Sequence, residues 1–151
     1  MTTVRPSDAG ARSAGQPELP SPISEATARL LGSLGIAAIA VIHILDAPGT
    51  YQSPGTRYIF WLYMAVIVGA IPVIGLLLHW PSRLAWAAAA ALALGPLVGY
   101  VVSRSIGLPG DPDDVGNWLD TLGMVSLFVE VSVLGLSLTR LALYERASSA
   151  G

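Results

Sequence analysis

A glutamate inside the last long apolar segment is the first candidate for chemistry in this sequence. Glu130 lies between two valines, and an ionisable side chain at the centre of a membrane helix is unfavourable by about 2.5–3.5 kcal/mol. Its charge must therefore be neutralised by a proton, a cation or hydrogen bonds. Gly123 and Ser126 share its helix face. Because small residues allow close helix packing, we expect Glu130 to point into a bundle.

A histidine and an aspartate form a second candidate, at the end of the first apolar segment. His43 and Asp46 are three residues apart and share a helix face. Such a pair can supply two metal ligands, a proton relay, or a carboxylate that orients an imidazole. A hydrogen-bonded pair that only packs the helix is the structural alternative. A metal ion, if one is bound, would use His43, Asp46 and Glu130.

Tyr100 and Arg104 form a third candidate, an i, i+4 pair at the end of the third apolar segment. Arg104 could reach lipid headgroups, pair with Glu130 or Asp46, or bind an anionic ligand. Antiparallel neighbouring segments would bring these groups to similar depth, with Glu130 beneath them. The candidate polar cluster consists of His43, Asp46, Tyr100, Arg104, Asp120 and Glu130.

Other cofactor and enzyme classes find little support. His43 and His79 each lie near the C-terminal end of their segment, and because these segments run antiparallel the two histidines lie on opposite sides of the membrane and cannot ligate one haem within a chain. The acidic stretch 111–114 lacks the spacing of an EF-hand loop, and Asn117 is a suitable N-cap for the last segment, with Asp120 at N3. Phosphate-loop, zinc-protease, nucleophile-elbow and dinucleotide motifs are absent from the sequence. No cofactor is firmly implied, and a non-enzymatic role is favoured.

Composition indicates the environment of these residues. The chain has 151 residues, 53% of them hydrophobic and 12% charged, with no cysteine, a net charge of −2 and a mean hydropathy of +0.62. Soluble domains carry about 25% charged residues. These values exclude a disordered chain, a disulfide scaffold, a cysteine–metal site and a basic nucleic-acid binder. They indicate an integral membrane protein, and the exclusive use of arginine among basic residues is typical of a G+C-rich bacterial genome.

Four apolar segments predict an all-α, four-helix membrane bundle. They cover about 30–46, 58–79, 84–106 and 118–143; a membrane helix needs about 20 residues, which the first segment reaches only marginally. Backbone groups in lipid must be satisfied within the segment, so helices are expected. The flanking regions predict a disordered cytoplasmic tail over 1–27 and a short cytoplasmic tail over 145–151, around a membrane domain at 28–144.

Arginine placement predicts the orientation. With both termini in the cytoplasm, six arginines lie inside and two, Arg57 and Arg104, lie outside, which agrees with the positive-inside rule. Four tryptophans near segment ends suggest an interfacial belt: Trp61, Trp80, Trp86 and Trp118.

Glycine and proline predict local structure. Turns are expected at Ala47-Pro48-Gly49, Ser53-Pro54-Gly55 and Pro109-Gly110. Gly95 and Gly99 form a G-x-x-x-G motif that favours close helix contact, within the chain or between chains.

One longer pattern resembles a known group. Gly99-Tyr100-Val101-Val102-Ser103-Arg104, Gly107-Leu108-Pro109-Gly110, Asn117-Trp118 and Ser126-Leu127-x-x-Glu130 are similar to the G-Y-x-x-S-R-x-x-G-L-P-G pattern of small four-span bacterial membrane proteins of unknown function. The resemblance covers about residues 30–140. It implies that the third span, the following loop and Glu130 form one unit, and it implies no activity.

Two functional hypotheses follow. The first is a small accessory or scaffold subunit of a membrane complex, with the lipid bilayer, a membrane protein partner or a second copy of the chain as its contacts and no nucleic acid. The alternative is a metal, quinone or proton site on the extracytoplasmic side, in a redox or transport role, built from His43, Asp46, Arg104 and Glu130. An open polar pocket reaching Glu130 would weaken the first hypothesis, and a closed hydrogen-bond network would exclude the second.

Overall fold

A computed structural model describes residues 23–52 and 54–149 of the chain. Within these residues the chain forms four α-helices and two short 3-10 turns, at Pro54–Thr56 and Pro112–Asp114. Each α-helix is long and apolar enough to cross a membrane, which confirms the expected all-α membrane bundle. The helices are α1 (Glu25–Gln52), α2 (Arg57–His79), α3 (Arg83–Ser105) and α4 (Thr121–Ser149).

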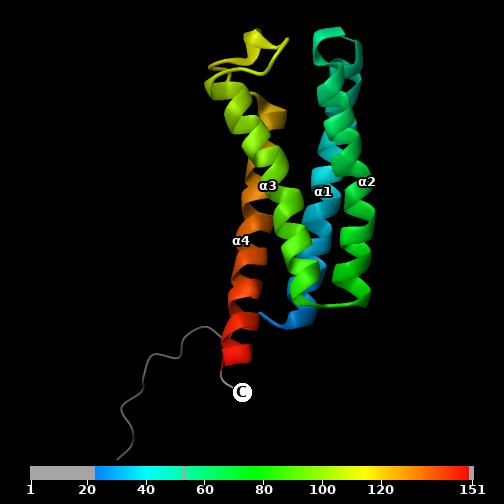
Figure 1. The fold of residues 1–151 in the computed structure, drawn as a ribbon, viewed down its shortest axis with the longest axis vertical. Coiled ribbons are helices and arrows are strands. Elements are labelled where there is room, and N and C mark those ends of the chain that lie inside the picture. Colours follow the sequence, from blue (N-terminus) through cyan, green and yellow to red (C-terminus); the bar gives the residue numbers. More distant parts are fainter. Residues whose placement is uncertain (1–22, 53, 150–151) are drawn as a thin grey trace, which may run out of the picture.

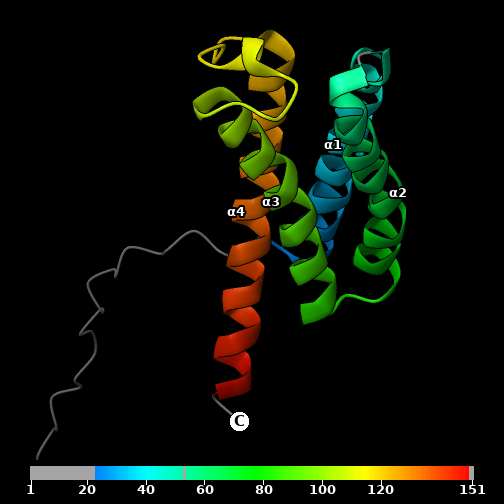
Figure 2. The ribbon, with the colours of Figure 1, turned by 45° about the horizontal axis from the view of Figure 1, so that its top comes forward.

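The helices run alternately up and down and pair as two hairpins. α1 packs mainly along α2, and α3 packs mainly along α4. The start of α1 and the end of α4 lie at one end of the bundle, here called the termini end, together with the short α2–α3 turn (Figure 1). The other two connections lie at the opposite end, the loop end. Figure 2 shows that the hairpins diverge toward the loop end.

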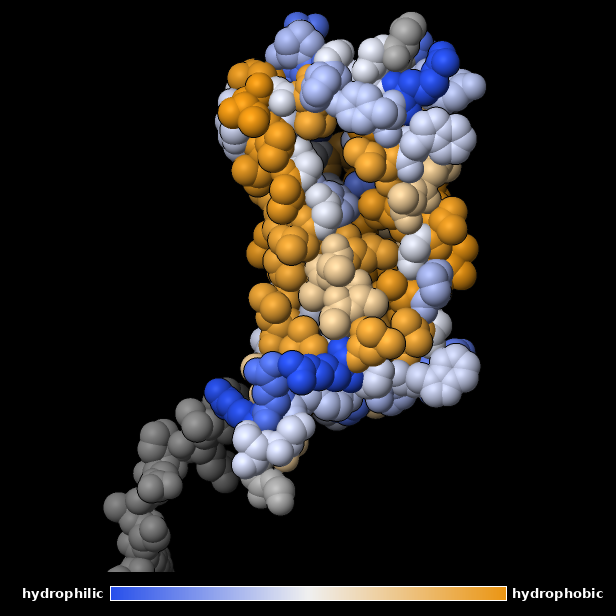
Figure 3. Space-filling view, in the orientation of Figure 1, coloured by the Kyte–Doolittle hydropathy of each residue, from blue (hydrophilic) through white to orange (hydrophobic). Residues whose placement is uncertain are grey.

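Apolar side chains cover the middle of the face shown in Figure 3, and polar side chains gather at both ends. This distribution is the one a bilayer requires, because the hydrocarbon core excludes polar groups and the headgroup regions accept them. The four spans therefore contact lipid.

The apolar core fills the termini end of the bundle. Ile36, Ile39 and Leu77 are fully buried there, as is the ring of Trp86. A Cβ at Gly32 would lie 3.1 Å from Trp86 Cζ3, so the glycine lets the indole pack directly on α1. The ring of Trp86 therefore packs into the bundle core instead of facing the lipid. The indole reaches inward because its Nε1 donates a hydrogen bond of 3.3 Å to Glu25, which satisfies its polar atom within the protein.

Charged side chains fasten the termini end. Arg29 on α1 donates hydrogen bonds to the carbonyl oxygens of Leu77 and Leu78, at the end of α2. Arg140 on α4 forms an ion pair with Glu25. Both arginines were expected only to set orientation, whereas here they also join elements far apart in the sequence.

Several boundaries differ from the expected ones. α1 extends from Glu25 to Gln52 through Pro48, so the turn expected at Ala47-Pro48-Gly49 is wrong. The Thr50 hydroxyl donates to the Ala47 carbonyl at 2.8 Å within this last part of the helix. The expected disordered tail lies largely outside the described residues, and its last three residues, 25–27, belong to α1.

Candidate functional site

A cleft of about 920 Å³ opens between the two hairpins toward the loop end. All four helices and the α3–α4 loop contribute to its wall, and Figure 3 shows the hollow between the hairpins above the packed part of the bundle. All six residues of the candidate polar cluster line this cleft. The structure thus brings together side chains that are up to 87 positions apart in the sequence (His43 to Glu130).

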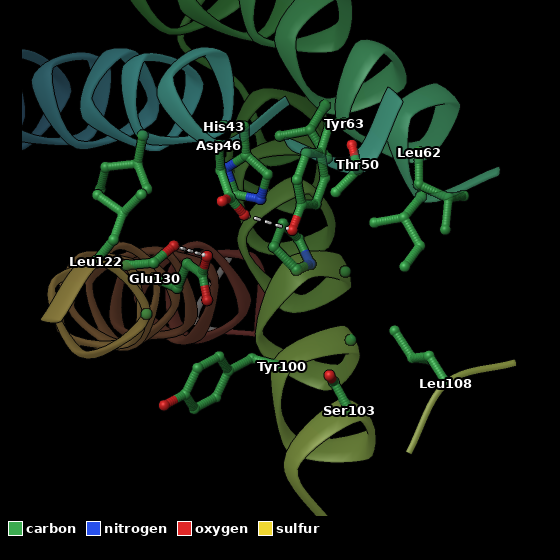
Figure 4. Close-up of a pocket in the computed structure, with 18 of the residues that line it drawn as sticks. His43, Asp46, Thr50, Leu62, Tyr63, Tyr100, Ser103, Leu108, Leu122 and Glu130 are labelled. Atoms are coloured by element: carbon green, nitrogen blue, oxygen red, sulfur yellow. Dashed lines mark hydrogen bonds between the residues drawn. The ribbon is translucent and has the colours of Figure 1, made fainter. Parts of the chain in front are cut away.

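Glu130 occupies the wall contributed by α4 and is only 1% exposed. It lies nine residues after the first residue of α4, or about 14 Å along the helix. The Ser126 hydroxyl donates to Glu130 Oε1 at 2.5 Å, which confirms the shared helix face. The second oxygen, Oε2, has no hydrogen-bond partner among the described residues. Figure 4 shows the carboxyl group at the hollow, facing the other labelled side chains.

His43 and Asp46 lie across the cleft on α1. His43 Nδ1 is 2.8 Å from the Ile39 carbonyl oxygen. A carbonyl only accepts, so Nδ1 carries the hydrogen, and in the neutral ring Nε2 is an acceptor. Asp46 accepts a 2.8 Å hydrogen bond from the Tyr63 hydroxyl, and the Tyr63 ring packs edge-on against His43, with centroids 4.8 Å apart. The histidine and the aspartate are therefore joined through Tyr63 on α2 (Figure 4).

Arg104 has a different partner from those expected. It forms an ion pair with Asp114, and its guanidinium lies 5.0 Å from the centroid of the Tyr100 ring. Arg104 therefore pairs with the α3–α4 loop and not with Glu130 or Asp46, the two carboxylates expected from the sequence. The reason is that Gly116 N donates to the Arg104 carbonyl at 2.9 Å, which folds the loop back over the end of α3.

Asp120 caps α4. Its side chain accepts a hydrogen bond from Gly123 N at 2.8 Å, and its carbonyl accepts the bond of Met124 N at 2.9 Å. The expected N-cap at Asn117 is therefore wrong, because α4 begins four residues later, at Thr121. Gly123 leaves space for the Tyr100 ring, whose hydroxyl donates to the Trp118 carbonyl at 2.9 Å.

The deeper wall of the cleft is apolar and lined by small residues. Gly95 and Gly99 on α3 have no heavy atom within 4 Å of the positions that their Cβ atoms would occupy. The G-x-x-x-G motif therefore makes no close helix contact among the residues that the structure describes, and the two glycines widen the cleft instead. The other residues of this part are chiefly aliphatic: Ala65, Val66, Gly69, Val73, Ala88, Ala91 and Leu92.

The two loops meet at the loop end. A Cβ on Gly110 would lie 2.5 Å from the Gly55 carbonyl oxygen, and the Tyr58 hydroxyl donates to the Pro109 carbonyl at 3.0 Å. Gly110 has a φ of +82°, as the expected Pro109-Gly110 turn requires. Nearby, partial burial raises the pKa of the Asp111 carboxyl, and the Asp114 carboxylate raises it further.

A metal centre lacks a ligand set in this arrangement. No group of three His, Asp or Glu side chains within the described part of the chain is placed to hold a metal ion. His43, Asp46 and Glu130 share the cleft wall without forming such a group.

Tyr63 and Asp114 bond members of the candidate polar cluster but are not themselves among its six residues. Tyr63 lies near the start of the apolar segment 58–79, and Asp114 ends the acidic stretch 111–114. Only the packing of α2 on α1 shows that Tyr63 bonds Asp46. No local signal identified Asp114 as the partner of Arg104.

Comparison with known proteins adds no family to this description: no family model matches the chain, and no curated protein or solved structure is significantly similar to it.

Proposed function

We propose that this four-span membrane protein binds a small amphipathic molecule in the cleft between its hairpins. The observation that carries the proposal is the unpartnered, buried Glu130 Oε2 in the wall of a 920 Å³ cleft. Buried polar groups in proteins almost always have a partner, and ligand sites are mostly apolar clefts of about 300–1,000 Å³ with a few polar groups. A bound molecule would supply the missing partner.

The wall of the cleft supports a ligand that comes from the lipid phase. Its deeper part, along α2 and α3, carries glycine, alanine and branched aliphatic side chains, which suit an apolar body. Its polar groups gather nearer the loop end, where His43, Asp46 and Arg104 lie. A molecule with an apolar body and a polar head matches both parts.

The proposal includes an orientation. We place both termini in the cytoplasm of a bacterium and the loop end at the outer face of its cytoplasmic membrane, since the arginine distribution favours this topology. The cleft then opens to the outer leaflet.

The accessory-subunit hypothesis is weakened by the same cleft. A scaffold role needs a well-packed surface for its partner, whereas the candidate polar residues surround a hollow. In one specific form of the accessory role, a helix of a partner protein fills the cleft. The following experiment distinguishes such a helix from a small ligand.

The test uses two glycines that have open space around their Cβ positions. Gly95 lines the cleft, while Gly135 lies on the exposed side of α4, outside it. We expect native mass spectrometry from nanodiscs to detect a bound small molecule in the wild type and in Gly135→Leu, and its loss in Gly95→Leu. Equal small-molecule content in all three proteins would contradict the proposal, and a co-purifying membrane protein lost only in Gly95→Leu would favour the accessory role.

A further inference from the structure

The hydroxyl donors of the cleft are already in use. Tyr63 donates to Asp46 and Ser126 to Glu130. Tyr100 donates to the Trp118 carbonyl, and Ser103 donates to Asp114 at 3.3 Å. A ligand that only accepts hydrogen bonds, such as a quinone carbonyl, therefore finds no free hydroxyl among these side chains.

The acceptors of the cleft are in excess. Five carboxyl groups line it, and Arg104 is the one arginine among the described residues that do so. That arginine is paired with Asp114 and lies against the Tyr100 ring. Its Nε has no hydrogen-bond partner among the described residues, but the guanidinium charge is already matched, so an anionic headgroup would meet a net negative wall. The four remaining carboxyl groups belong to Asp46, Asp111, Asp120 and Glu130.

Two aromatic rings stand beside these acceptors. Tyr63 lies on α2 and Tyr100 on α3, and both contribute to the cleft wall (Figure 4). The face of a tyrosine ring attracts cations, and the Arg104 guanidinium lies 5.0 Å from the centroid of the Tyr100 ring.

We propose that the molecule bound in the cleft is a lipophilic cation, a protonated amine or an onium ion with apolar substituents, and that Glu130 is its counter-ion. This inference rests on the proposed function and adds the charge of the ligand head. A carboxylate buried in an apolar wall is stabilised by an opposite charge far more than by a neutral neighbour. Asp46 and His43 Nε2 supply further acceptors on the opposite wall.

The test compares two ions of nearly the same shape and opposite charge. Tetraphenylphosphonium and tetraphenylborate are titrated separately into the full-length protein in nanodiscs of neutral lipid, with decylubiquinone as a neutral third probe and empty nanodiscs as the blank. We expect saturable binding of tetraphenylphosphonium and none of tetraphenylborate. Because this comparison uses the wild type, it does not depend on any variant folding.

The variant comparison addresses the counter-ion. Glu130→Gln keeps the size of the side chain and removes its charge, and we expect it to weaken tetraphenylphosphonium binding by about tenfold or more. Glu145→Gln is the matched control, since Glu145 lies at the termini end in an exposed pair with Arg83, and its affinity should equal that of the wild type.

The outcomes separate the two proposals. Binding of decylubiquinone or tetraphenylborate without tetraphenylphosphonium would overturn the cation inference and leave the proposed function standing. An unchanged affinity for tetraphenylphosphonium in folded Glu130→Gln would also overturn it. Failure of all three probes to bind the wild type would overturn both proposals.

Discussion

Replacing Gly110 with alanine is expected to separate the two hairpins at the loop end. Gly110 has a φ of +82°, where an alanine is disfavoured by about 1–2 kcal/mol. The added Cβ would also lie 2.5 Å from the Gly55 carbonyl oxygen, and ordinary contact begins at 3.4 Å. The two backbones would have to move apart by about 1 Å, and such overpacking destabilises by a further 1–3 kcal/mol or so.

Gly116→Ala is the control that isolates the steric part. Gly116 has a φ of +81°, so alanine there meets the same backbone strain, but no heavy atom of the described residues lies within 4 Å of its Cβ position. We therefore expect Gly116→Ala to lower the free energy of unfolding by about 1–2 kcal/mol and Gly110→Ala to lower it by about 2–5 kcal/mol.

The separation itself can be measured with spin labels. The natural chain has no cysteine, so Gln52→Cys and Asp113→Cys, both at exposed positions, give one label on each side of the loop contact. Electron–electron double resonance should report a longer distance in Gly110→Ala and the wild-type distance in Gly116→Ala. Equal stabilities and equal distances for the two alanine variants would refute the reasoning, because the backbone contact would then have no energetic role.

Three further predictions concern stability. Trp86→Ala should lower the free energy of unfolding in detergent by about 3–5 kcal/mol because it empties the core, whereas Trp61→Ala, 63% exposed, should change it by less than about 1 kcal/mol; similar losses would contradict the assigned core. Glu25→Gln removes the partner of a buried arginine and a bond from an indole, so its melting temperature should fall clearly below that of Glu145→Gln, whose exposed pair contributes at most about 1 kcal/mol. Asp111 has a raised pKa in the folded state, so the folded protein binds more protons than the unfolded one and its stability should fall as pH rises above the ordinary aspartate value; melting curves of Asp111→Asn should lack that component, and an unchanged slope would disprove it.

The four helices could be predicted from the sequence because hydropathy and span length are local properties. The Ser126–Glu130 hydrogen bond could be predicted for the same reason, since an i, i+4 spacing places both side chains on one helix face. The position of Glu130 inside the bundle followed from the small residues beside it.

Other features depend on how helices rotate and where loops fold, which no local pattern contains. Gly95 and Gly99 suit either a close helix contact or an open space, and only the divergence of the hairpins decides between them. The sequence offers four partners for Arg104, and its actual one, Asp114, is set by the loop that Gly116 folds back onto α3. Pro48 is a helix breaker by type, yet here α1 continues past it.

The pairing of the helices into two hairpins has a consequence for biosynthesis. Since α1 packs chiefly on α2, and α3 on α4, each helix makes most of its contacts with the helix that leaves the ribosome immediately before or after it. Insertion can therefore proceed as two successive helical pairs, and the joining of the pairs through Trp86 and the Arg140–Glu25 ion pair is the step that completes the molecule.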